Sequence, residues 1–417
     1  MSEKVMNRWL AVVGAILIQL ALGAIYAWSV FTPELVLKGW EKGQTQNVFA
    51  AGLAFFAVVM VFAGRLMPKV GPRKLAITGG IVLGLGYVLA GLVGGTSYWA
   101  ILILVGVIGG SGIGLAYVVP IAVGTRWFPD KKGLIMGLAV AGFGFGAMLW
   151  VKLAGSVGNL IATLGLSQTF LIYGIAFMLM VVIGGIFMVF PPDGWKPAGW
   201  NPPIPKEGKL ASGALDFTSG EMLKTPQFYM IFLCFVAGGG AGLMSIGLMK
   251  LFPMEALGKN GYSEAESSAI SGAAMAYFFS IANGLGRILW GAMSDKLGRK
   301  LSIIIMLATQ GVVVLAFPMM AGSEYLLYLG ATIIGFNFGG NFALFPSITA
   351  DTFGNKFVGQ NYPWVFLAYG VGGIAGPIMG GKLGDMGNFP LAFTICGVAV
   401  LAAAVVAALI KPAKQVA

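Results

Sequence analysis

The sequence has no histidine, only two cysteines and few charged side chains, and each shortage excludes a class of function. Without histidine there can be no Ser-His-Asp triad, no histidine-ligated metal and no imidazole proton relay. Cys234 and Cys396 lie inside apolar runs, so they indicate neither a disulfide framework nor a thiolate metal site. Charged residues make up 10% of the chain, against roughly 25% in soluble proteins. This excludes a soluble enzyme, a disordered chain and a nucleic-acid binder.

Apolar side chains are abundant instead. They form 58% of the 417 residues, or about 240 side chains, where soluble proteins have roughly 45–50%. At about 20 residues per membrane-spanning helix, this is enough for about a dozen spans. The net charge of +11 then fits basic loops beside a membrane better than a surface for DNA. The apolar run after Met1–Asn7 has no small-residue cleavage signal, so we expect the first span to be retained.

Polar breaks divide the sequence into long apolar segments that predict an all-α membrane protein with twelve transmembrane helices in two groups of six. The predicted spans are 9–36, 45–66, 75–95, 99–124, 132–157, 168–190, 227–253, 265–292, 301–320, 324–349, 361–384 and 388–410. We therefore expect an N-terminal six-helix bundle over 1–190, a linker over 191–226 and a C-terminal six-helix bundle over 227–417. The linker is rich in proline and cannot span a bilayer. Thr218 and Glu221 in it form a T-x-x-E capping box, which predicts a short amphipathic helix on the membrane face.

The distribution of basic residues predicts the orientation of the chain. Of the 26 Lys and Arg residues, 19 fall on the side of the termini and the linker, six fall on the opposite side, and Arg287 belongs to neither. By the positive-inside rule, both termini and the linker are then cytoplasmic. All 15 acidic residues fall near helix ends or in loops, so no carboxylate is expected in the middle of the membrane.

One loop motif occurs in both halves, at an offset of 227 residues. The copy after the eighth span reads G-x-x-x-D-x-x-G-R-K, and its motif residues are Gly291, Asp295, Gly298, Arg299 and Lys300. The copy after the second span, Gly64–Lys74, has Pro68 at the aspartate position and Pro72 at the first arginine position. Two six-helix repeats predict a cavity between the halves, with substrate bound near the midplane and a rocking motion of one half against the other.

The motif at Gly291–Lys300 resembles the loop signature of the major facilitator superfamily, which implies the major facilitator fold with pseudo-twofold symmetry. The two prolines of the first copy depart from that signature and put its usual charge relay in doubt. A narrower resemblance, to the oxalate/formate antiporter family, covers nearly the whole chain. It rests on the strings Asn7-Arg8-Trp9, Gly23 to Trp28, Arg126 to Lys131, Ser219 to Leu223, Thr225 to Phe228 and Ala343 to Pro346. The chain is also loosely similar to animal monocarboxylate transporters.

Arg287 is the strongest candidate for binding substrate. It precedes Asp295 by eight residues, or about 12 Å of helix, which places it inside the membrane toward the cytoplasmic half. A buried guanidinium costs several kcal/mol, so it needs a partner or a task. One reading is a two-pronged donor for a carboxylate, and the other is a structural arginine that snorkels to the rim. Asn283, one turn away, can orient the guanidinium, bind substrate or simply pack. The family resemblance implies that Arg287 is the carboxylate-binding arginine of helix 8.

The resemblance also implies a lysine in helix 11 of oxalate transporters, but this chain has Tyr369 at that position. One cation suits one carboxylate, because a second would stay poorly solvated. Three phenylalanines in the tenth and eleventh spans offer rings for an apolar tail, unless they are plain core: Phe338, Phe342 and Phe366. Tyr26 and Tyr117 are intramembrane hydroxyls at positions where the family has aromatic hydroxyls in the site, with helix packing as the alternative.

These observations predict a secondary active transporter of small, lactate- or pyruvate-like monocarboxylates rather than an enzyme. We expect a monomer in the lipid bilayer of the bacterial cytoplasmic (inner) membrane, with no cofactor, no metal and no nucleic-acid partner. Proton-coupled symport with a capacity for exchange is the expected mode, because the chain has no nucleotide-binding motif and needs a gradient. One alternative is an oxalate:formate type of carboxylate antiporter. Another, from a different class, is a carboxylate-sensing membrane receptor, which the absence of a signalling domain disfavours.

Overall fold

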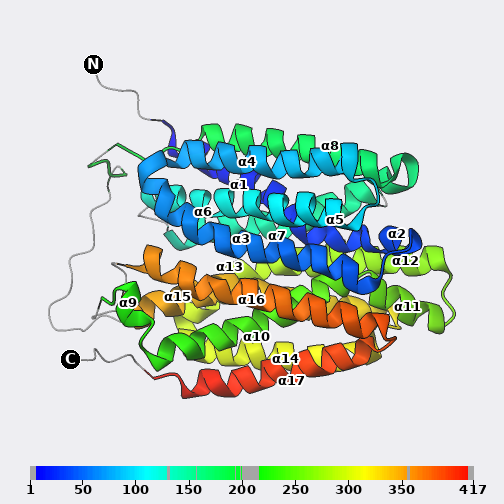
Figure 1. Cartoon of the computed structure of the whole chain (residues 1–417). Coiled ribbons are helices and arrows are strands. Elements are labelled where there is room, and N and C mark those ends of the chain that lie inside the picture. The colour runs from blue at the N-terminus through cyan, green and yellow to red at the C-terminus, as the bar shows by residue number, and fades with distance from the viewer. Residues whose placement is uncertain are drawn as a thin grey trace.

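The structure is a computed structural model that describes residues 6–128, 132–155, 157–192, 194–197, 199, 216–354 and 357–411. Its elements are all helical (Figure 1). Up to residue 190 they are α1 (Arg8–Leu22), η1 (Gly23–Val30), α2 (Thr32–Leu37), α3 (Lys42–Val70), α4 (Pro72–Leu89), η2 (Ala90–Gly94), α5 (Tyr98–Ile101), η3 (Leu102–Gly109), α6 (Gly110–Trp127), α7 (Lys132–Ala154) and α8 (Leu160–Ile186). We call residues 1–190 the N-terminal half.

The remaining elements follow residue 218. They are α9 (Ser219–Met222), α10 (Pro226–Leu248), α11 (Leu251–Lys259), α12 (Glu264–Ala273), η4 (Ala274–Phe279), α13 (Ser280–Leu297), α14 (Arg299–Met320), α15 (Glu324–Phe353), α16 (Val358–Asp385) and α17 (Phe389–Leu409). We call residues 227–417 the C-terminal half. The label η marks a 3₁₀-helix at η1 and π-helices at η2, η3 and η4.

The described residues contain 11 helices that are long and apolar enough to cross a membrane, and a shorter apolar helix over Val140–Ala154 within α7. The mean hydropathy of the 11 ranges from 1.2 to 2.5. Many large side chains that stay exposed are apolar, such as Phe62, Leu179 and Val405. A water-soluble surface would carry charges there, so these faces suit lipid. The predicted all-α membrane fold is confirmed.

Most predicted spans differ from the structure by a few residues at their ends, and three differ by a break or bend in the helix. The sixth begins at Leu160 rather than at residue 168, and its helix bends at Gly165, where φ is +76°. The seventh ends at Leu248, and the separate helix α11 takes up the residues after it. The first continues from α1 into the 3₁₀-helix η1, and α2 is a separate short helix. The prediction missed these breaks, because mean hydropathy stays high across them although single polar residues such as Lys250 and Glu34 lie there.

The two ends of the helix bundle can be told apart by the chain termini and the short helices that lie there. α1 begins and α17 ends at one end, where the short helix α9 also lies (left in Figure 1). We call this the inner end, and the opposite end, with α2 and α11, the outer end. The predicted capping box before α9 is confirmed, since the Thr218 hydroxyl accepts from the Glu221 N–H and the Glu221 carboxylate accepts from the Thr218 N–H at 2.7 Å. Donation from the Thr218 N–H, and also from its hydroxyl, lowers the pKa of the exposed Glu221 carboxyl.

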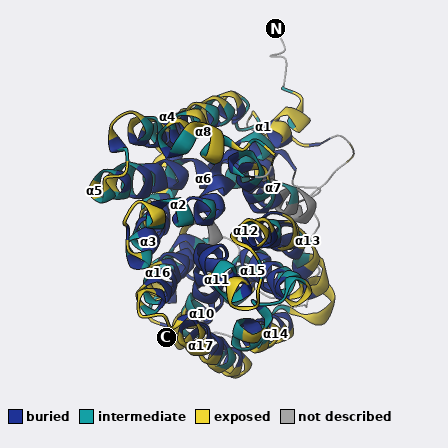
Figure 2. Cartoon of the chain, turned by 90° about the vertical axis from the view of Figure 1, so that its right-hand side faces the viewer, coloured by how far each residue is buried: buried dark blue, intermediate teal, exposed yellow. Residues whose placement is uncertain are grey.

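The two halves lie one above the other when the helices are viewed from the outer end (Figure 2). α3 packs against α16 and α7 packs against α13 across the boundary. Glycines allow the second contact, because a Cβ at Gly144 would lie 2.8 Å from the Gly284 nitrogen. Small residues that let helix backbones approach are the usual basis of helix packing in membranes. The contact places the middle of α13, which carries Arg287, against the N-terminal half.

Polar contacts also join the halves at the outer end. The Asp385 carboxylate at the end of α16 accepts the N–H groups of Lys42 and Gly43 at the start of α3, at 2.6 and 2.8 Å. The Lys42 ammonium also forms an ion pair with Glu255 of α11, with 3.2 Å between nitrogen and oxygen. An anion at a helix N-terminus is favourable because the first N–H groups have no partner in the helix. These contacts hold the start of α3 against the outer ends of α16 and α11.

Candidate functional site

Arg287 lies on α13 with its guanidinium between the two halves. The residue is 2% exposed, and its Nε donates to the Asn283 Oδ1 at 3.2 Å. The two terminal nitrogens are buried and have no hydrogen-bond partner of ordinary geometry, while the hydroxyls of Tyr26 and Tyr117 lie close enough to interact with the guanidinium. No carboxylate among the described residues forms an ion pair with these nitrogens. The guanidinium thus keeps the two donors that a carboxylate binds in a fork arrangement. Asn283 holds the third nitrogen and fixes the direction of the fork.

Aromatic rings from both halves enclose the guanidinium. Its Cζ lies 4.0 Å from the centroid of the Phe342 ring of α15 and 5.5 Å from that of the Phe143 ring of α7. A cation over a ring face is attracted by the ring quadrupole, and the effect grows when water is excluded. The rings stabilise Arg287 partly, but they accept none of its N–H groups.

Three tyrosine hydroxyls surround the guanidinium. The hydroxyls of Tyr26 in η1 and Tyr369 in α16 are 3.1 Å apart and form a hydrogen bond across the halves. Tyr117 in α6 packs edge-on against Phe143, with ring centroids 5.4 Å apart. All three tyrosines are buried and lie within electrostatic range of Arg287. The predicted hydroxyls are therefore next to the predicted cation.

The other two predicted phenylalanines complete the cluster. Phe338 lies edge-on to Tyr26, with ring centroids 5.5 Å apart, and Phe366 stacks on Tyr369 at 5.0 Å. Phe366 also lies 5.9 Å from the Tyr117 ring. The structure thus brings together all eight side chains that the sequence singled out for substrate binding: Arg287, Asn283, Tyr117, Tyr26, Tyr369, Phe338, Phe342 and Phe366. Their role in binding stays a prediction.

Sequence reasoning missed three aromatic residues of this cluster. Phe143 faces Arg287, Phe56 of α3 contacts the rings of Tyr117 and Tyr369, and Tyr362 lies within electrostatic range of Arg287. Phe143 had a signal in the sequence, because it stands in a run of alternating glycines, G-F-G-F-G, where a large side chain is conspicuous. Phe56 had none, since it lies in a uniformly apolar segment.

The loop motif of the C-terminal half forms a charge network apart from this site. Arg299 pairs with Asp295 at 2.5 Å and with Asp351 of α15 at 3.5 Å, and it also contacts Ser294 and the Gly291 carbonyl. Lys300 donates to the Ile410 carbonyl at 2.9 Å, and Gly298 adopts a φ of +84° between α13 and α14. The network joins α13, α14, α15 and the end of α17 at the inner end. It holds helices in place and does not reach Arg287.

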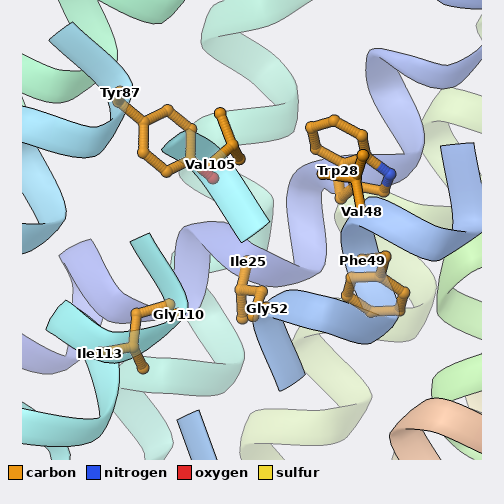
Figure 3. A pocket seen from close by; sticks show the side chains of 9 residues that line it. All are labelled: Ile25, Trp28, Val48, Phe49, Gly52, Tyr87, Val105, Gly110 and Ile113. Atoms are coloured by element: carbon orange, nitrogen blue, oxygen red, sulfur yellow. The ribbon is translucent and has the colours of Figure 1, made fainter. Parts of the chain in front are cut away.

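A small pocket in the N-terminal half lies elsewhere (Figure 3). Its walls are the residues Ile25, Trp28, Val48, Phe49, Gly52, Tyr87, Val105, Gly110 and Ile113. None of them is charged, and the Trp28 indole N–H is already bound to the Thr45 carbonyl at 2.9 Å. A carboxylate would find no cation there, so the pocket is not a candidate for anion binding. The described residues also contain no cluster of His, Cys, Asp and Glu that could hold a metal ion.

Comparison with known proteins gives matches along the whole chain. The family model of the Major Facilitator Superfamily matches residues 5–278 and 251–416. A protein named uncharacterized MFS-type transporter YhjX, from Escherichia coli, is 30% identical over 374 residues, which are 88% of this chain and 86% of the relative. The oxalate:formate antiporter of Oxalobacter formigenes is 27% identical over 97% of this chain and 92% of its own length. Monocarboxylate transporter 13 of Rattus norvegicus is 24% identical over 94% of this chain and 86% of its own length.

Proposed function

Because the chain belongs to the Major Facilitator Superfamily, whose members are transporters and not enzymes, we propose that it is a secondary active transporter of small monocarboxylates. The observation that carries this proposal is the buried Arg287, whose two terminal nitrogens have no hydrogen-bond partner in the structure. A buried charge without a partner costs several kcal/mol. A substrate carboxylate bound by both nitrogens offsets that cost, and Asn283 keeps the guanidinium in the orientation that this requires.

The rest of the site favours one carboxylate and an apolar tail. Arg287 is the single cation of the described cluster. Tyr369 occupies the position at which oxalate transporters of the oxalate/formate antiporter family, which this chain resembles, have a lysine. The rings of Phe338, Phe342 and Phe366 are buried in the same aromatic cluster as the guanidinium, and they offer no hydrogen-bond donor. Lactate and pyruvate match this arrangement, with an anionic end for Arg287, a small polar group for the tyrosine hydroxyls and a methyl group for the rings.

Exchange of oxalate for formate is the second candidate. It is favoured by the similarity to the oxalate:formate antiporter, which extends over 97% of this chain. Formate fits one cation, but a dicarboxylate such as oxalate would leave one negative charge without a partner. We therefore place it after monocarboxylate transport.

The proposed mechanism is alternating access. The bundle over 1–190 and the bundle over 227–417 rock about the site, and the linker over 191–226 joins them. No Asp or Glu lies near Arg287 among the described residues, so a resident proton carrier in the site is not part of the proposal. A proton enters with the substrate, or through a carboxylate at the outer end such as Glu34 or Asp385. The carrier with bound substrate reorients faster than the empty carrier, because the bound carboxylate neutralises Arg287. A symporter with this property also exchanges internal for external substrate.

We further propose that the protein works as a monomer in the bacterial inner membrane, with its termini and linker in the cytoplasm. The support is the basic inner end. Lysines and arginines cluster there, whereas the outer end carries only six basic residues, and such an asymmetry sets orientation in bacterial membranes.

Counterflow in proteoliposomes tests the function. Vesicles that are preloaded with lactate should take up labelled lactate faster than empty vesicles, and an acid exterior should increase the initial rate in both. A screen of mono- and dicarboxylates of one to five carbons, measured by thermal shift on the purified protein, should rank lactate and pyruvate above oxalate. Binding of lactate without any counterflow would support the receptor hypothesis instead. No effect of internal lactate would contradict the claim that return of the empty carrier is slow.

A further inference from the structure

The turn between α3 and α4, at the inner end, carries a cluster of positive charge (Figure 1). Four exposed basic side chains stand within residues 65–74: Arg65, Lys69, Arg73 and Lys74. No acidic residue stands among them, and the sequence has none between Glu41 and Asp130. The part of the chain around this turn therefore supplies no carboxylate to balance the four cations.

The rest of the structure does not balance this charge either. Among the described residues, no carboxylate forms an ion pair with any of the four side chains. The guanidinium of Arg65 is directed at the C-terminal half, with its Cζ 5.7 Å from the ring centroid of Trp364 on α16. Lys69, Arg73 and Lys74 are exposed and have neither an ion pair nor a ring contact within the described part of the chain. We call these three residues the basic turn.

The matching turn between α13 and α14 shows what happens when an acid is present. At the offset of 227 residues, Asp295 takes the place of Pro68. Arg299 in that turn pairs with Asp295 at 2.5 Å and with Asp351 of α15 at 3.5 Å, so its charge is balanced within the protein. The basic turn has no acid at the matching position. An anion that balances its charges has to come from outside the chain.

The basic turn stands at the end of two apolar faces. On α3, large exposed side chains recur at helical spacing up to the turn: Phe55, Val58, Phe62 and Leu66. On α4 they recur after it: Ile81, Leu85 and Leu89. Residues three or four apart lie on one side of a helix, so each series forms a stripe that suits lipid. Lys69 follows Leu66 by three residues, on the same side of α3. Lys74 precedes Ile81 by seven, so the stripe on α4 also ends in a cation.

The two stripes meet at the turn, because the turn is short. Gly71 alone separates the end of α3 from the start of α4. The Cα atoms of Lys69 and Arg73 are therefore at most about 14 Å apart, since one residue spans no more than about 3.6 Å. A lipid with acyl chains on the two stripes has its headgroup at this turn. The phosphodiester of such a headgroup is an anion whose oxygens lysine and arginine bind.

We propose that the basic turn binds the headgroup of an anionic phospholipid whose acyl chains lie along α3 and α4. Charge complementarity selects this class of lipid, because the amine of a zwitterionic headgroup is repelled by the same cations. Clusters of basic residues beside a membrane-spanning helix attract anionic lipids in this way, and the attraction weakens with salt. The inference goes beyond the proposed function and does not depend on which substrate the protein transports.

Thermal stability with added lipid tests the site. In detergent, phosphatidylglycerol should raise the thermal midpoint of the native protein more than phosphatidylcholine with the same acyl chains. The triple variant with Lys69→Gln, Arg73→Gln and Lys74→Gln should lose that difference. Each single change should weaken the apparent affinity for phosphatidylglycerol about fivefold. Without added lipid, the midpoints of all these variants should equal the native one, because the side chains are exposed and form no ion pair in the described structure.

The matched control is Lys296→Gln. Lys296 is exposed and stands in the other turn at the position of Lys69, 227 residues later. This variant should keep the native difference between the two lipids. An equal rise with both lipids, or a full effect of phosphatidylglycerol on the triple variant, would overturn the site. An equal loss in Lys296→Gln would also overturn it, because the effect would then follow the total charge of the protein.

Two further measurements identify the anion and its place. Glycerol phosphate and inorganic phosphate should leave the thermal midpoint unchanged, since neither has acyl chains for the two stripes. A rise with either that matches the rise with phosphatidylglycerol would assign the turn to a soluble anion and contradict the proposal. Phosphatidylglycerol with a photoreactive acyl chain should label peptides of α3 and α4, and less so in the triple variant. Labelling of these peptides that is equal in the triple variant would place the lipid elsewhere. None of these results depends on whether the protein moves lactate.

Discussion

The turn between α3 and α4 and the turn between α13 and α14 have nearly the same backbone but different chemistry. Gly71 has φ +88° and ψ 152°, and Gly298 has φ +84° and ψ 148°. Each glycine ends one helix and begins the next. Only the second turn has the Asp295–Arg299 ion pair, because the first has prolines at the matching positions. The two turns thus follow the same backbone path, but only the second turn has an ion pair of opposite charges.

The site shows the same inequality between the halves. The C-terminal half supplies the cation Arg287 and the amide of Asn283, whereas the N-terminal half supplies rings and hydroxyls such as Phe143, Tyr26 and Tyr117. Under the proposed function, the substrate anion would bind to the C-terminal half, and the N-terminal half would close over it. The comparison can be tested by moving or removing charge and by straining the two turns.

The largest effect is expected from Arg287→Gln. The loss of a charge-assisted interaction costs about 1.5–3 kcal/mol, or about 10- to 150-fold in binding, and uptake should fall accordingly. Arg287→Lys should also fail, since a point charge cannot replace the guanidinium fork. Uptake in proteoliposomes, together with gel filtration to verify folding, measures both. Uptake at the native rate by Arg287→Gln would mean that the arginine is structural.

Tyr369→Lys should change substrate preference. A second cation beside Arg287 would neutralise a second carboxylate, so inhibition by oxalate should strengthen relative to lactate by about tenfold, which corresponds to about 1.4 kcal/mol. The variant also removes the hydroxyl that bonds Tyr26, and Tyr369→Phe is the control for that loss. Competition assays on the three proteins decide it. An unchanged ratio of inhibition by oxalate and lactate would contradict the argument from charge matching.

The two turns should respond alike to strain. Gly71→Ala and Gly298→Ala each place a Cβ in the extended region of positive φ that is essentially restricted to glycine, at a cost of about 1–3 kcal/mol, and nothing lies within 4 Å of either added Cβ. The thermal midpoint should therefore fall by similar amounts in both variants. Arg299→Gln alone should also lower the thermal midpoint, because it breaks the ion pair, whereas Lys74→Gln in the other loop should leave the thermal midpoint unchanged. A much larger loss for Gly298→Ala would show that the charge network, not the backbone, decides the stability of that turn.

Asn283→Asp should leave uptake close to the native value at low pH and have its clearest effect on the pH dependence of uptake. The new carboxylate can pair with Arg287 when it is ionised, and would then compete with the substrate. Protonation removes that competition, so uptake by the variant should rise relative to the native protein as the pH falls. Initial rates measured across a range of external pH test this. Parallel profiles for the two proteins would mean that the residue at 283 does not face the substrate.

The sequence by itself determined the all-α membrane class, the approximate positions of the spans and the one intramembrane cation. Long apolar runs need no tertiary information to be identified as spans, because the bilayer imposes their length and their composition. Arg287 could be found in the same way, since a charge inside such a run is expensive and therefore conspicuous. The break within the sixth span and the end of the seventh were not predictable, because they depend on local backbone geometry at Gly165 and on packing after Leu248.

Only the tertiary structure decided what surrounds the cation. The hydroxyls of Tyr26 and Tyr369 meet across 343 residues of sequence, and Phe143 faces Arg287 because glycines let α7 and α13 touch. Hydropathy and periodicity describe each helix alone, whereas partners from different helices depend on how the two halves pack, and no local pattern specifies that packing.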